Sequence, residues 1–322
     1  MSTLPVAERV APRRRVRDWL GDRILLLLTA GASLFAVVVF GLIIWKVVDS
    51  SRLAFDKFGI SFLWDTVWDA NPLKNIYGAG TLIYGTAVTS LMALVIAVPL
   101  AIAIALFLSE LAPKSVRGIV GPLVEMLAAI PSVVLGLWGI LILGPFLADH
   151  VEPWLHRWFG FLPIFGATFF SSGVFIAGVI LAIMVVPIVA SICRELFLSV
   201  PRELEEGAIA LGATRWEMVR GVVLHSSRSG IAAAVILGLG RAIGEAIAVT
   251  QVIGAATDIN ISLFPPGDTL ASRIAGQYQG AVSNVQISAL FYLAAILLVI
   301  GLLTNLLAQF IVRRFDVRGG AR

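Results

Sequence analysis

Long apolar runs divide the sequence into segments of membrane-spanning length. The first run covers residues 24–45, which is 22 residues without a charge. A helix needs about 20 apolar residues to cross the hydrocarbon core of a bilayer. The later runs predict spans at residues 82–108, 126–148, 172–193, 230–256 and 286–312. The third span is expected to begin near Val120, because Glu125 can lie near the interface. The pattern therefore predicts an all-α integral membrane protein with six transmembrane helices.

The segment that precedes the first run is basic, with six arginines within residues 1–23. A signal peptide also begins with basic residues, but its apolar region has only about 7 to 15 residues and a small-residue cleavage site follows. Here Lys46 and Asp49 follow the run. We therefore expect an uncleaved first transmembrane helix at 24–48, followed by an extracytoplasmic loop at 49–75.

The distribution of charge predicts the orientation. Hydrophobic residues make up 59% of the chain and charged residues 14%, whereas soluble domains have about 25% charged residues. Of the 24 Lys and Arg residues, 17 lie on one side of the predicted membrane and 5 on the other. The basic side comprises residues 1–23, 109–117, 194–229 and 313–322. This bias predicts that both termini are cytoplasmic. The basic N-terminal tail suits anionic membrane lipid better than nucleic acid.

The predicted cytoplasmic loop at 194–229 has its own helical signals. Pro201 is followed by acidic residues that favour a helix N-terminus, and Gly212 is a natural helix stop. Thr214 and Glu217 have the spacing of a capping box that starts a second helix. We expect a helix, a glycine turn and a second helix lying on the cytoplasmic surface.

The fifth predicted span contains two charges, Arg241 and Glu245. A charge in the middle of a span costs roughly 2.5 to 3.5 kcal/mol, so such residues face a bundle interior or a wet cavity. At i and i+4 the two side chains are expected to share one face of a helix. One interpretation is a structural ion pair. The other is an anion station, in which the planar Arg241 fork binds an oxyanion and Glu245 competes with that anion.

Other candidate sites are weaker. His150 and His156 are six residues apart, and we expect a solvated loop there and no metal site. The sequence contains no arrangement that predicts a catalytic residue, and Cys193 has no second cysteine for a disulfide or cluster. Pro131 and Ser132 could break the third helix and expose backbone groups to the pathway.

The 194–229 loop resembles the coupling loop of ABC importer permeases, whose pattern has an acidic residue, two small residues, a glycine and a later apolar pair. The matching residues are Glu206, Gly207, Ala208, Gly212, Val222 and Leu224. Gly207 replaces the usual central alanine and His225 replaces the usual final proline. The resemblance implies that this loop couples the chain to a separate ATPase. The sequence has no phosphate-binding loop of its own, so ATP and Mg²⁺ are expected on that partner, with no cofactor in this chain.

A narrower resemblance rests on residues 129–139 and 237–254, which are similar to the PstC-type permease subunits of high-affinity phosphate ABC importers. It implies a type I ABC importer permease (MetI-like) fold, with a core at 76–312 and a multi-pass location in the cytoplasmic (inner) membrane of a prokaryote. It also implies that Arg241 and Glu245 take part in phosphate movement. The implied partners are a PstA-type second permease, an ATPase dimer and an extracytoplasmic phosphate-binding protein.

Alternatives remain at this point. The chain could be a permease for another oxyanion, such as sulfate or molybdate. In another class, it could be an ATP-independent secondary transporter or channel that uses the charged pair as a proton relay. A membrane-embedded enzyme is disfavoured, because no set of His, Ser or carboxylates is predicted to gather at one depth.

Overall fold

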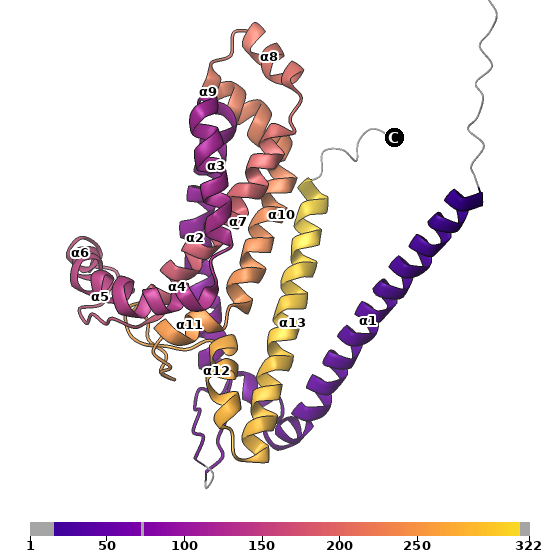
Figure 1. Cartoon of the computed structure of the whole chain (residues 1–322). Helices are drawn as coiled ribbons and strands as arrows, with labels where there is room; N and C mark the ends of the chain where they lie inside the picture. The colour runs from indigo at the N-terminus through magenta and orange to yellow at the C-terminus, as the bar shows by residue number, and fades with distance from the viewer. Residues whose placement is uncertain (1–15, 72–73, 316–322) are drawn as a thin grey trace, which may run out of the picture. The chain divides into compact units, whose positions relative to one another are not determined.

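The computed structural model describes residues 16–71 and 74–315 and is built from helices (Figure 1). The α-helices are α1 (Val16–Phe58), α2 (Gly80–Leu106), α3 (Lys114–Ala128), α4 (Ser132–Trp138), α5 (Gly144–Phe146), α6 (Glu152–Phe159), α7 (Val174–Leu198), α8 (Arg202–Ala210), α9 (Arg215–Met218), α10 (Leu224–Gly244), α11 (Ile247–Val252), α12 (Leu270–Gln277) and α13 (Asn284–Phe315). Short π-helical turns lie at Phe107–Leu111, Gly139–Leu143, Leu147–Val151 and Val219–Val223, and 3-10 turns at Gly59–Leu63 and Tyr278–Gly280.

Six helical stretches within the described residues are long and apolar enough to cross a membrane, which confirms the expected number. They are Gly21–Leu63, Gly80–Leu111, Ser132–Phe159, Val174–Leu198, Arg215–Gly244 and Asn284–Phe310. The bounds of all six differ from the expected ones, by five residues or fewer at each end of the second, fourth and sixth stretches and by more in the other three. The fifth stretch was expected at 230–256 but begins at Arg215 and ends at Gly244.

The first helix is longer than expected. α1 continues to Phe58, through ten residues that were predicted to belong to the outer loop. Charges at 49–57 mark where a chain leaves hydrocarbon, but they do not end a helix. The helix ends where Gly59 adopts a φ of 57°, a left-handed conformation that glycine takes readily. The described residues divide into two compact units, one that ends at Asp49 and one that begins at Ser50. Within the first unit, the side chains of residues 21–45 are exposed.

The third span does not run from Val120 to Ala148. α3 ends at Ala128, and a new helical stretch begins at Ser132 and continues to Phe159. Pro131 lies at the break: it lacks a backbone N–H, and it disfavours helical geometry at Ile130. α3 packs beside α7, whereas α4 turns away from the direction of α3 (Figure 1). The predicted break at Pro131 and Ser132 is thus present.

The hairpin predicted in the 194–229 loop is smaller than expected. α7 extends to Leu198. The second helix of the hairpin does not lie separately on the surface, because α9 continues through the π-helical turn into α10, giving one helical stretch at Arg215–Gly244. Only α8 and the turns that flank it lie outside the spanning helices. His225 stands within a continuous helix, which a proline at that position would disturb.

The centre of the second unit is α7. In its most apolar window 72% of residues are buried, against at most 33% in the other spans. α2 packs closely along it. The buried face of α2 carries alanine at every fourth position, namely at Ala93, Ala97, Ala101 and Ala105. Small side chains at this spacing let two helices approach closely in a membrane protein, where packing holds helices together. α10 also packs against α7, and α13 packs against α10.

A second hydrophobic cluster joins the segment after α1 to the first half of α13. Phe62 stacks on Tyr292 with ring centroids 4.5 Å apart, and Trp68 meets Tyr77 edge to face at 4.9 Å. Trp68, Tyr77 and Ala79 belong to the same buried cluster as Leu290 and Leu293 of α13.

Candidate functional site

Arg241 and Glu245 do form an ion pair, but they do not lie on one helix. Arg241 is in the last turn of α10, which ends at Gly244, and Glu245 is extended with a ψ of 115°. Arg241 Nη2 lies 3.4 Å from Glu245 Oε2. The two side chains differ in environment: that of Arg241 is 46% exposed, whereas that of Glu245 is 6% exposed. The pair therefore spans a break in the fifth span, and the expectation of a shared helical face is wrong.

Glu245 has a second partner that the sequence pattern did not suggest. Its Oε1 accepts a hydrogen bond of 3.2 Å from the backbone N–H of Ala248, in the first turn of α11. The first N–H groups of a helix have no partner within the helix, and a carboxylate is favoured at that end. Glu245 thus caps α11 with one oxygen and holds Arg241 with the other. The local sequence signal for a helix end here was Gly244, the residue directly before Glu245, because glycine is common where helices end.

The two sequence stretches that carried the narrower resemblance meet in space. Helix α4 packs against α11, and the two helices approach closely at Gly136, where an added Cβ would lie 2.8 Å from the Cα of Ala248. Each of the two helices begins directly after a break in a span. Glycine at position 136 is required by this approach, because no other side chain fits there. The charged pair thus stands next to a crossing of two discontinuous helices, an arrangement typical of transporter binding sites.

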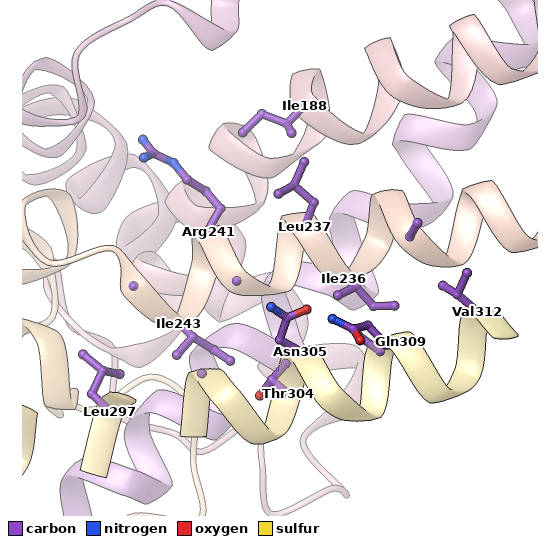
Figure 2. A pocket seen from close by; sticks show the side chains of 15 residues that line it. Ile188, Ile236, Leu237, Arg241, Ile243, Leu297, Thr304, Asn305, Gln309 and Val312 are labelled. Carbon is purple, nitrogen blue, oxygen red and sulfur yellow. The ribbon is translucent and has the colours of Figure 1, made fainter. Parts of the chain in front are cut away.

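Arg241 lies at a groove of about 890 Å³. α10 forms its floor and α13 lines one wall, while Ile188 of α7 contributes on the opposite side (Figure 2). The lining is apolar except for four residues: Arg241, Thr304, Asn305 and Gln309. Ligand sites are typically concave and mostly apolar, with a few polar groups that orient the ligand. The exposed guanidinium of Arg241 is the only full charge on its lining among the described residues.

The coupling hairpin, which we define as residues 199–224, has the expected turn. Gly212 has a φ of 89° and ends α8, and the capping box of Thr214 with Glu217 is present. At the tip, Leu211 is 92% exposed, and Leu204 and Trp216 are exposed as well. Large apolar side chains gathered on a projecting surface indicate a protein contact.

The residues that match the coupling-loop pattern divide into two groups. Glu206 and Gly207 are exposed on α8. Ala208, Val222 and Leu224 are partly buried and pack against the main hydrophobic core. Gly212 lies in open space, with nothing within 4 Å of an added Cβ. The apolar members therefore attach the hairpin to the helix body, and the exposed members remain available to another molecule.

A buried ion pair was missed by the sequence reasoning, which counted Asp268 and Arg273 only as outer-loop charges. Arg273 Nε lies 2.6 Å from Asp268 Oδ2, and both side chains are buried. Arg273 also donates to the carbonyl of Ala255 at 3.3 Å and lies over the ring of Trp68 at 5.6 Å. Thr269 caps α12 at the same place. The pair therefore connects α12 with Ala255, which follows α11, and with Trp68.

Burial raises the pKa of the Asp268 carboxyl, and the Arg273 guanidinium opposes that shift. Thr269 and Ser272 lie between the two charged residues in the sequence, and their spacing was a visible signal of a helix cap. The pairing itself was not predictable, because charges five residues apart across a helix start have no fixed relative position.

The two histidines, His150 and His156, contact different backbone carbonyl groups. Nδ1 of His150 is 3.2 Å from the carbonyl oxygen of Phe146, and Nδ1 of His156 is 2.9 Å from that of Phe165. Within residues 16–71 and 74–315, no three His, Cys, Asp or Glu side chains gather in a way that could hold a metal ion.

Comparison with known proteins fits this geometry. Residues 97–317 match the family model described as "Binding-protein-dependent transport system inner membrane component". Over 294 residues the chain is 42% identical to the phosphate transport system permease protein PstC of Pasteurella multocida, covering 90% of this chain and 91% of that protein. The chain belongs to the PstC family of binding-protein-dependent permeases. The PstC protein of Xylella fastidiosa strain 9a5c is 40% identical, with 99% of both chains covered.

Solved structures agree with PstC membership at the level of the fold. The chain matches a bacterial ABC transporter that imports alginate with a TM-score of 0.59 at 19% identity, covering 92% of this chain and 99% of that one. It matches the MetNI methionine ABC transporter with a TM-score of 0.51 at 21% identity, covering 72% and 92%. The expected type I ABC importer permease fold is confirmed. As a PstC-type protein, the chain is a multi-pass inner-membrane transport subunit.

Proposed function

We propose that this chain is the permease subunit through which an ATP-driven importer moves inorganic phosphate into the cell. The observation that carries the proposal is the near full-length similarity to PstC proteins together with an exposed arginine on the groove. The proposed complex contains a PstA-type second permease and an extracytoplasmic phosphate-binding protein. Two ATPase subunits would bind ATP and Mg²⁺. Both termini and the coupling hairpin lie on the cytoplasmic side, in accord with the distribution of Lys and Arg.

The contacts of Arg241 favour weak binding and release of an oxyanion over tight binding. A guanidinium offers two parallel N–H donors to two oxygens of a phosphate. Glu245 already occupies part of that donor set, at 3.4 Å, so an arriving phosphate must compete with a carboxylate for Arg241. Competition lowers the affinity and favours release. When no anion is present, Glu245 keeps the guanidinium from standing uncompensated in a low-dielectric groove.

One continuous helical stretch would couple movement of the ATPase to the position of Arg241. Arg215–Gly244 begins at the hairpin turn and ends beside Glu245. With 1.5 Å of rise per residue, 30 residues span about 45 Å. A rigid-body movement of an ATPase held by α8 would therefore tilt the same helix that carries Arg241. Packed helices transmit such movements between discrete arrangements.

Uptake measurements in a strain that lacks this gene test the proposal. Restoring the gene should restore uptake of labelled phosphate, and excess unlabelled phosphate should compete while sulfate and molybdate should not. Uptake should stop when cellular ATP is depleted with the proton gradient maintained. Competition by sulfate or molybdate would reassign the anion. Uptake that persisted without ATP would favour a secondary transporter or channel.

The glycine of the coupling hairpin gives a sharper prediction. Gly212→Val should abolish ATP-driven uptake, whereas Gly212→Asn should retain most of it. Space does not decide the outcome, because an added Cβ meets nothing within 4 Å. The backbone does, because φ is 89° and a left-handed conformation costs most side chains roughly 1–2 kcal/mol, with asparagine among the exceptions. Uptake and ATP hydrolysis of the purified complex are the measurements.

A control for this experiment is available in α3, outside the coupling hairpin. Gly118 is helical and exposed, and an added Cβ there also meets nothing within 4 Å. Gly118→Ala should therefore leave uptake unchanged and should stabilise α3, since alanine is preferred to glycine in a helix by about 1 kcal/mol. Equal activity of the valine and asparagine variants at position 212 would show that the turn conformation does not matter for coupling.

A further inference from the structure

The wall of the groove that faces α10 carries two amide side chains that the sequence reasoning did not single out. Asn305 and Gln309 lie four residues apart on α13, so they share one face of that helix and are separated by about 6 Å along its axis. Both line the groove and both are exposed. In Figure 2 they project from α13 toward the space beside α10, with Thr304 next to Asn305.

The surroundings of these amides differ from the rest of the exposed surface of α13. The other large exposed side chains in this part of the helix are apolar. They are Leu302, Leu303, Leu306, Leu307 and Phe310. That surface suits lipid. Across the described residues, neither Asn305 nor Gln309 has a hydrogen-bond partner on its side chain. Amides without partners are unfavourable in hydrocarbon, so their gathering on the groove indicates that this side of α13 meets water, a ligand or polar groups.

The order of polar residues along the groove gives it a direction. Arg241 lies near the end of α10 at Gly244. Asn305 and Gln309 lie farther toward Val312, in the half of α13 that leads to its C-terminal end (Figure 2). In Figure 2 the Arg241 side chain points away from α13, whereas Asn305 and Gln309 lie between α10 and α13. All three line the same groove, so an anion that leaves Arg241 toward Val312 crosses the groove over α10 to reach the two amides.

We propose that Asn305 and Gln309 contact the transported anion after it leaves Arg241, and so form the next two polar positions of the path. This proposal rests on the proposed function. A primary amide donates hydrogen bonds through its NH₂ group to phosphate oxygens and accepts a hydrogen bond from a P–OH group through its carbonyl oxygen. Because it carries no charge, it holds an anion more weakly than an arginine does. Weak neutral contacts following one charged contact favour onward movement toward the cytoplasm.

Leucine substitution is the first test, carried out on the complete importer in proteoliposomes with its binding protein. The double variant Asn305→Leu, Gln309→Leu should carry phosphate about tenfold more slowly, as expected for the loss of two neutral hydrogen bonds. The matched control is Leu303→Ala with Leu307→Ala, an exposed pair at the same spacing outside the groove, and its uptake should be unchanged. Normal uptake by an assembled leucine variant would overturn the proposal.

Cysteine accessibility is the second test, and it does not depend on the leucine variant assembling. Asn305→Cys and Gln309→Cys should react with an anionic methanethiosulfonate reagent, lose uptake on modification, and be protected by phosphate. The native Cys193 is buried and gives little background, and Leu307→Cys serves as the control on the other surface. Thiols that react only after the complex is dissociated would place these residues in a subunit contact and overturn the proposal.

The two levels of the proposal can fail separately. If the unmodified complex carries sulfate instead of phosphate, the proposed function is wrong, and the same variants are then scored with the anion that is carried. If the unmodified complex carries phosphate and the modified thiols leave uptake intact, only the role of Asn305 and Gln309 is wrong.

Discussion

Arg241→Gln should reduce phosphate uptake about 100-fold while the complex still assembles. The guanidinium can offer two charge-assisted hydrogen bonds to a passing anion, each worth about 1.5 kcal/mol, and about 3 kcal/mol corresponds to a factor of about 100. Assembly should persist because the Arg241 side chain is 46% exposed on the groove and because Glu245 keeps its hydrogen bond from Ala248. Uptake by proteoliposomes and the subunit content of the purified complex are the two measurements.

Two further variants separate charge from geometry in this experiment. Arg241→Lys keeps the charge and loses the planar fork, so uptake should be intermediate. Glu245→Gln keeps a carbonyl oxygen that can accept from Ala248 and removes the competing charge, so uptake should stay within about tenfold of the unmodified level. If Arg241→Gln carried phosphate normally, the pair would be structural, which was the first interpretation of the sequence pattern.

Arg273→Met should destabilise the protein by about 3–5 kcal/mol, the usual cost of breaking a buried ion pair from one side. Methionine fills similar space but leaves Asp268 buried without its cation, 2.6 Å from where the guanidinium nitrogen stood. Thermal unfolding of the purified complex in detergent measures the loss. The double variant Asp268→Asn, Arg273→Met should recover part of the stability, because no buried charge then remains.

The pH dependence of the Arg273→Met variant has a definite sign. Burial already raises the pKa of Asp268 with Arg273 opposing it, so removal of Arg273 raises that pKa further. A carboxyl whose folded-state pKa lies above its unfolded value of about 3.9 is neutral in both states at lower pH and costs nothing there. The destabilisation should therefore be smallest below about pH 4 and grow as the pH rises toward the folded-state pKa. Destabilisation that stayed constant across that range would show that lost packing, and not the charge, was responsible.

Hydropathy predicted the number of spans but not where the spans are broken. Uncharged runs show which residues tolerate lipid, and they say nothing of backbone continuity. Pro131 was a visible sign of the first break. The second break, at Glu245, follows Gly244 with no proline nearby, and the i, i+4 spacing of the two charges suggested an intact helix. The extended backbone there depends on the cap that Glu245 provides to α11, which becomes apparent only when both helices are in place.

Sequence patterns predicted interactions between residues a few positions apart, but they did not predict contacts between distant segments. The capping box of Thr214 and Glu217 and the left-handed Gly212 are encoded within a few residues, and both are present. The Asp268 and Arg273 pair depends on Trp68 and Ala255 from other segments. The amides of α13 were hidden because two neutral polar residues barely alter the hydropathy of a 32-residue helix. Their position became informative only beside α10.

The two bonds of Glu245 make the break in the fifth span sensitive to what Arg241 binds. An anion that draws the guanidinium away leaves the carboxylate with only the Ala248 N–H, which changes the balance of forces at the junction of α10 and α11. Thermodynamic linkage makes this effect reciprocal: whatever alters the junction must alter the affinity of Arg241 for its anion by the same factor. Because α10 also begins at the coupling hairpin, one carboxylate links the occupancy of the groove to the state of the helix that an ATPase would move.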